Sequence, residues 1–77
     1  MNTKKAKEYY EIGILTGFDA IRDPLGGGWL LVVVGQNDRS WTMQTARGDE
    51  KTYSKLDTLV EEVESITSGF SALHISL

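Results

Sequence analysis

The densest group of apolar residues in the chain follows three glycines and ends at a fourth. It reads Gly26-Gly27-Gly28-Trp29-Leu30-Leu31-Val32-Val33-Val34-Gly35. Such a short apolar run, bounded by turn residues, predicts a strand, and its lack of polar alternation is typical of a strand that is covered on both faces. We expect the rest of the chain to be arranged around this strand.

Turn-forming residues lie on both sides of this strand. A proline and three glycines between Asp23 and Gly28 predict a turn, which follows a strand over roughly Phe18 to Asp23. After the central strand, Gln36 to Arg39 predicts a tight hairpin loop, and Trp41 to Arg47 forms the returning strand. Gly48 and Asp49 predict a second two-residue turn.

Loop length decides which residues share a face of the sheet. A two-residue loop at Asn37-Asp38 places Val34 opposite Trp41. One face then comprises Leu30, Val32, Val34, Trp41 and Met43, and the other comprises Trp29, Leu31, Val33 and Tyr53. We expect the C-terminal helix to cover the first set. A slip of one residue in the register would exchange the two faces.

The N-terminal segment favours a helix from Thr3 to about Ile12 or Ile14, with Asn2 or Thr3 as the N-cap. Period-two alternation at the end of this segment also permits a strand, and Gly13 weakens a helix. In the helical interpretation, Gly17 allows the backbone to leave the helical conformation before the first strand begins.

The clearest helix pattern runs from Ser54 to Thr67. Ser54 and Asp57 resemble a capping box, and Gly69 is expected to end the helix. The apolar stripe is Leu56, Leu59, Val60, Val63 and Ile66, and the glutamates opposite it are Glu61, Glu62 and Glu64. We interpret these glutamates as a solvated face. The alternation from Phe70 to Leu77 predicts a short last strand.

These elements predict a single small domain over residues 1–77. Its fold class is α+β, an antiparallel β-meander of three to five strands with the C-terminal amphipathic helix on one face. The short N-terminal helix lies across an edge or on the other face. A chain of 77 residues without cysteine buries only about 60% of its unfolded surface and has no disulfides to stabilise it. Self-association is therefore an option.

Charge and hydropathy narrow the class of protein. Eight Lys plus Arg against eleven Asp plus Glu give a formal net charge of −3, which disfavours a nucleic-acid coat that depends on a basic surface. The N-terminus is polar and basic, and the longest apolar run is six residues, far short of a membrane span. We expect a cytoplasmic protein that does not engage a membrane.

Candidate catalytic residues are few. Gly26 to Gly28 could form a phosphate cradle, but this loop precedes a strand rather than a helix and is better explained as a turn. His74 has no nucleophile motif near it, and one histidine without cysteine cannot build a zinc site. We expect no catalytic residues, no metal, no cofactor and no enzymatic activity.

The second face of the central strand remains as a candidate binding face, formed by Trp29, Leu31, Val33 and Tyr53. In one interpretation the N-terminal helix covers this face. In the other it is exposed and binds a protein partner or a second copy of the chain. Aromatic side chains beside basic residues also fit single-stranded or duplex nucleic acid, with possible contacts at Arg22, Arg39, Arg47 and Lys51.

The region from Gly28 to Ile66 also carries a resemblance. Its strings are Gly-Gly-Trp-Leu-Leu-Val-Val-Val-Gly, Ser-Trp-Thr-Met-Gln-Thr-Ala-Arg-Gly and Lys-Thr-Tyr-Ser-Lys-Leu-Asp-Thr-Leu-Val. They resemble small uncharacterised proteins carried on bacterial plasmids and other mobile elements, which implies an accessory or regulatory role. The strand order is also similar to sheet-reading DNA-binding modules of plant transcription factors and phage integrases. Those modules present Arg where this chain has Leu31 and Val33.

Overall fold

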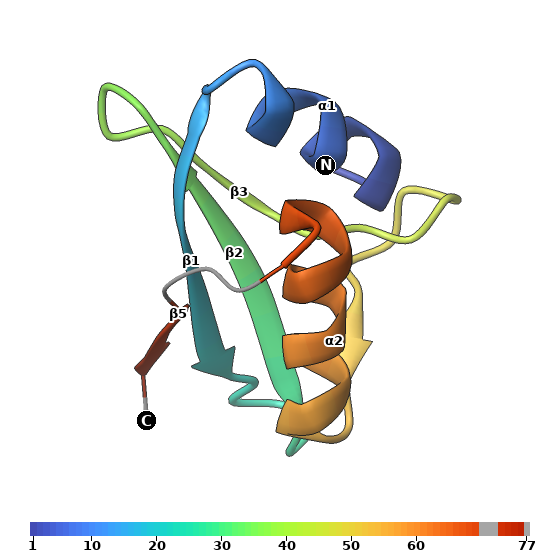
Figure 1. The fold of residues 1–77 in the computed structure, drawn as a ribbon. Helices are drawn as coiled ribbons and strands as arrows, with labels where there is room; N and C mark the ends of the chain where they lie inside the picture. The colour runs from blue at the N-terminus through green and yellow to red at the C-terminus, as the bar shows by residue number, and fades with distance from the viewer. Residues whose placement is uncertain (70–72, 77) are drawn as a thin grey trace.

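The computed structural model describes residues 1–69 and 73–76. Within these residues, two helices lie on the same side of one sheet and form a two-layer structure (Figure 1). The elements are α1 (Thr3–Glu11), β1 (Leu15–Arg22), β2 (Trp29–Gly35), β3 (Ser40–Thr42), β4 (Thr52–Tyr53), α2 (Leu56–Thr67) and β5 (Leu73–Ser76). This architecture confirms the predicted α+β fold.

β2 lies at the centre of the sheet, whose order is β3-β2-β1-β5. β1 and β3 flank β2 in antiparallel orientation, and β4 pairs with the start of β2 beyond the end of β3. The last strand, β5, runs parallel to β1. It falls inside the strand predicted over Phe70 to Leu77, of which positions 70–72 and 77 lie outside the described residues.

The ends of α1 are determined by local hydrogen bonds. The side chain of Asn2 caps the helix, because its Oδ1 accepts a 2.9 Å bond from the backbone N–H of Lys5. After the C-cap at Ile12, Gly13 takes the left-handed conformation with φ +81°. The helix therefore ends at Ile12, the earlier of the two predicted positions, and β1 begins before the predicted Phe18.

The hairpin between β2 and β3 differs from the prediction by one residue. Asn37 and Asp38 both have φ of 60°, as expected for the loop centre. The backbone N–H of Gly35, however, donates a 2.7 Å bond to the carbonyl oxygen of Arg39. The loop thus contains three residues, and Trp41 lies opposite Val33 rather than Val34.

This shift brings Trp41 and Met43 to the face of β2 that carries Leu31 and Val33. Leu31 and Val33 are 0% exposed and belong to the core beneath the helices. The prediction that α2 covers Leu30, Val32 and Val34 was wrong, because strand side chains alternate and these three point to the opposite side.

Both helices contribute to the core on this one face. α1 contributes Ala6, which is 0% exposed, and packs Tyr10 against Phe18 of β1 with ring centroids 6.2 Å apart. Its Tyr9 meets Trp41 of β3 edge-on, with ring centroids 5.8 Å apart. α2 adds the predicted stripe members Leu59, Val63 and Ile66, which are 0%, 3% and 2% exposed.

α2 begins and ends differently from its sequence pattern. Lys55 is the N-cap and makes no side-chain capping bond, so the predicted Ser54 capping box does not form. Asp57 still lies in the first turn, where its negative charge is favourable beside the helix dipole. At the other end, Ser68 takes the left-handed position with φ of 58° that was expected for Gly69.

Two adjacent leucines of β2 provide a test of the register. Leu31→Ala should destabilise the protein by about 2–5 kcal/mol because it creates a cavity in the core. Leu30→Ala should cost clearly less, because Leu30 points away from the helices and is partly exposed. Urea unfolding at low protein concentration measures both changes. A larger loss at Leu30 than at Leu31 would contradict the observed register.

Candidate binding surface

The face that the sequence predicted for binding lies in the core. Trp29, Leu31, Val33 and Tyr53 do share one face, as expected, and Trp29 pairs directly with Tyr53. Leu31 and Val33 are 0% exposed, Tyr53 is 3% exposed, and Trp29 packs against the same cluster. In the folded chain Leu31, Val33 and Tyr53 therefore pack in the core beneath the helices, and Trp29, which borders this cluster, stays partly exposed.

Three of the four predicted nucleic-acid contacts lie over aromatic rings of the chain itself. The pairs are Arg22 over Trp29 at 5.3 Å, Arg39 over Trp41 at 5.5 Å and Lys51 over Tyr53 at 5.4 Å, measured from the cationic group to the ring centroid. The fourth residue, Arg47, is exposed in the turn before Gly48. These cation–π contacts occupy ring faces on which bases would otherwise stack.

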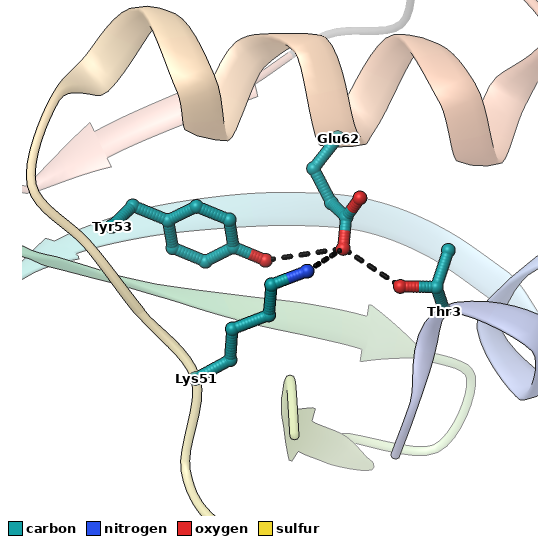
Figure 2. A network of polar contacts seen from close by, with 4 residues as sticks. All are labelled: Thr3, Lys51, Tyr53 and Glu62. Atoms are coloured by element: carbon teal, nitrogen blue, oxygen red, sulfur yellow. Dashed lines mark hydrogen bonds and ion pairs between the residues drawn. The ribbon is translucent and has the colours of Figure 1, made fainter. Parts of the chain in front are cut away.

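The most connected polar group of the described chain is the carboxylate of Glu62 on α2 (Figure 2). Its Oε1 accepts bonds from Thr3 Oγ1 at 2.7 Å, Lys51 Nζ at 2.9 Å and Tyr53 Oη at 3.3 Å. Thr3 belongs to α1 and Tyr53 to β4, so one oxygen atom links both helices to the sheet. The prediction that Glu62 is solvated was wrong, since its side chain is only 14% exposed.

The periodicity of the helix could have indicated from the sequence that Glu62 is partly buried. Glu62 lies three residues after Leu59 and four before Ile66, both of which are buried. Residues at these spacings occupy the same side of a helix. The position therefore borders the buried stripe, although the residue type suggested the opposite face.

The pKa values of this cluster follow from its contacts. Burial by itself raises the pKa of Glu62, but the hydrogen bonds from Lys51, Thr3 and Tyr53 and the positive charge of Lys51 outweigh it and hold the pKa below its usual value. Burial, the negative charge of Glu62 and the bond to it raise the pKa of Tyr53. At neutral pH the carboxylate is charged and the phenol is protonated, so neither group is suited to general acid–base catalysis.

The glycine loop surrounds a small cavity of about 170 Å³. Asp23 lines it, and its carboxylate accepts a 2.9 Å bond from the backbone N–H of Leu25. A Cβ at Gly28 would lie 2.7 Å from the carbonyl oxygen of Tyr53, so Gly28 permits the close approach of β4. The loop is thus explained as a turn, and the carboxylate of Asp23 makes the cavity unfavourable for phosphate.

The structure adds little support for a metal site or a membrane-spanning helix among the described residues. No group of three or more metal-ligating side chains occurs among the described residues. In that same part of the chain, no helix has both the length and the apolar character to cross a membrane. His74 lies in β5, where the backbone register pairs it with Asp19 of β1.

The accessible surface with the most apolar character is the side of the sheet opposite the helices, here called the open face. By strand register, its described members on β1 to β4 are Gly17, Asp19, Ile21, Leu30, Val32, Val34, Ser40, Thr42 and Thr52. On β5, His74 and Ser76 pair with Asp19 and Ile21 and belong to the same face by register. The four aliphatic members are partly exposed, and none of them belongs to the core cluster or packs against it. Three of them follow one another along β2.

The open face carries little charge. Its ionisable members are Asp19 and, by register, His74, which lie in one row with Val32 and Thr42 across the sheet. The β3 and β4 side of the aliphatic column presents hydroxyl groups. The surface is therefore an aliphatic column with hydroxyl-bearing residues on one side, and with the carboxylate of Asp19 and the register positions of His74 and Ser76 on the other.

The Glu62 cluster makes stability depend on pH. Because its folded-state pKa is lowered, the ionised carboxylate stabilises the fold above the unfolded pKa of about 4.3, and this contribution is lost as pH falls through the lower folded pKa. Glu62→Gln should destabilise the protein by about 1–3 kcal/mol at pH 7, and its difference from the wild type should shrink on acidification.

Urea unfolding between pH 7 and strongly acidic pH measures this dependence. Glu61→Gln is the matched control, because Glu61 is exposed on the same helix and should change stability little at any pH. A Glu62→Gln difference that stays constant over the whole range would show that the charge of Glu62 does not stabilise the fold.

Comparisons of this chain with protein-family models, with curated proteins and with solved structures found no match.

Proposed function

We propose that this protein is a small non-enzymatic accessory or regulatory module that binds protein through the open face of its sheet. The observation that supports this most directly is the position of the two described helices, which pack on one side of the sheet (Figure 1). On the other side, Ile21, Leu30, Val32 and Val34 remain partly exposed. Contiguous exposed apolar patches commonly mark interaction sites.

The sequence of β2 adds a second argument. An antiparallel strand with one solvated face normally alternates apolar and polar residues. Leu30, Val32 and Val34 occupy the positions where polar residues would suffice for folding, because the core uses Leu31 and Val33. Their aliphatic character is thus better explained by contact with a partner than by the stability of the folded chain.

The chemistry of the open face favours protein over the other ligand classes. Nucleic acid requires cations along the phosphate backbone, whereas the open face carries the carboxylate of Asp19. Aliphatic side chains beside Thr42 and Thr52 fit an apolar protein surface with a polar rim.

A site-specific crosslinking experiment tests this proposal. Because the chain contains no cysteine, Thr42→Cys places a unique attachment point for a photo-crosslinker on the open face. In extracts of the cells that encode the protein, this probe should form discrete adducts. Excess unlabelled wild-type protein should suppress them, and excess unlabelled Val32→Lys protein should not.

The matched control moves the probe away from the open face. Leu25 is 96% exposed in the turn between β1 and β2, and Ile12 is 69% exposed after α1. The same probe at Leu25→Cys or Ile12→Cys should not give these adducts. Identical adducts from all three positions, or none from Thr42→Cys, would overturn the proposed function.

A further inference from the structure

We propose that the N-terminal segment, residues 1–12, is a hinged strap that opens from the sheet as a unit while the rest of the fold stays intact. The strap comprises α1 and the residues that flank it. In the closed state, the hydrogen bond from Thr3 to Glu62 holds the strap against α2 (Figure 2). This inference is independent of the proposed function, because it concerns the covered side of the sheet.

The strap is attached through few buried side chains. Ala6 is the buried member of the nine-residue α1, whereas α2 buries three residues. Tyr9 and Tyr10 pack against the core but stay partly exposed. A helix as short as α1 is not stable by itself in water, where isolated helices need about 12–15 residues. Segments with few buried apolar contacts open at a lower free energy than the fold as a whole.

Thr3 joins the strap to α2 at a carboxylate that has other partners. Oε1 of Glu62 accepts bonds from Thr3 at 2.7 Å, from Lys51 at 2.9 Å and from Tyr53 at 3.3 Å. Lys51 and Tyr53 lie outside the strap, so opening removes one of three donors and leaves the charge of Glu62 paired. The hydroxyl of Thr3 moves to water. Opening therefore avoids the large cost of a buried carboxylate without a partner.

Gly13 provides the hinge. Its φ of +81° lies in the left-handed region, which glycine adopts without strain. The chain beyond the hinge is fixed to the loop between β2 and β3 by Gln36. Nε2 of Gln36 donates a 3.1 Å bond to the carbonyl oxygen of Gly13, and its backbone N–H donates a 3.2 Å bond to that of Ile14. A conformationally free residue thus follows the strap directly, and the chain after it is anchored.

The strap covers groups that are suited to interaction. Its two tyrosines pack on Trp41 of β3 and Phe18 of β1. The backbone carbonyl of Met1 accepts a 2.7 Å bond from the N–H of Gln44, just beyond β3 at one end of the sheet order. Opening would expose two aromatic side chains and an unpaired N–H at a sheet edge, which are features that bind apolar surfaces and added strands. The closed strap is therefore an intramolecular cover over this surface.

Native-state hydrogen exchange, resolved at single amides by NMR, tests whether the strap opens separately. The amides of Lys7 to Glu11 should exchange through an opening at least about tenfold more frequent than the one that exposes the amides of β2. Their exchange should also depend less on urea, because strap opening exposes less surface than global unfolding. Amides of α1 and β2 that share one opening frequency and one urea dependence would overturn the inference.

Thr3→Val tests the bond that holds the strap closed, because valine keeps the β-branched shape and removes the hydroxyl. Losing a hydrogen bond to a charged group should raise the exchange rate of the α1 amides about tenfold. Thr58→Val is the matched control, since Thr58 is exposed on α2 and should leave exchange in α1 unchanged. Equal effects from the two variants would overturn the role of Thr3.

Leu30→Ala separates strap opening from global unfolding. Leu30 lies on the open face, on the other side of the sheet from α1, so its contacts persist when the strap opens and are lost when the sheet unfolds. The variant should therefore speed exchange in β2 more than in α1. Acceleration of both by the same factor would show that strap and sheet open together, which contradicts the inference.

Discussion

The burial of Leu31 and Val33 by both helices is the constraint on which the rest of the structure depends. The two helices lie on the same face of the sheet and contact each other, and the bond from Thr3 of α1 to Glu62 of α2 joins them directly. Lys51 and Tyr53 attach the same carboxylate to the region of β4. With both helices held on one side, the opposite side of β2 receives no cover from the described residues.

The register that selects this face depends on contacts between residues that a local pattern does not connect. A Cβ on Gly35 would lie 2.8 Å from Cζ3 of Trp41, so the indole packs over the glycine. Gly35 is on the same side of β2 as Val33, and the observed register brings Trp41 to this side. The residue types Asn37 and Asp38 correctly predicted the left-handed loop centre, but they fit loops of two and of three residues. The fold class and most elements were therefore predictable, and the covered face was not.

The missed role of Glu62 has a different physical origin. Periodicity analysis assigns a side chain to water or to the core by its type, and it gave the correct assignment for Leu59 and Val63. A carboxylate beside the buried stripe is stable there when donors from other elements reach it, and Thr3 and Lys51 do so from distant positions in the sequence. Such a contact can be inferred only after the helix and β4 have been placed against each other.

The open face links association to stability in a chain of this size. The aliphatic side chains of Ile21, Leu30, Val32 and Val34 gain little hydrophobic stabilisation while water contacts them, and each would gain up to about 1.5–3 kcal/mol on complete burial. Any partner that binds the folded chain and not the unfolded chain raises its stability by mass action. A 77-residue domain with no cysteine has few other sources of additional stability. The aliphatic residues on the second side of β2 are thus explained if the fold reaches its full stability in a complex, where both faces of its central strand are covered.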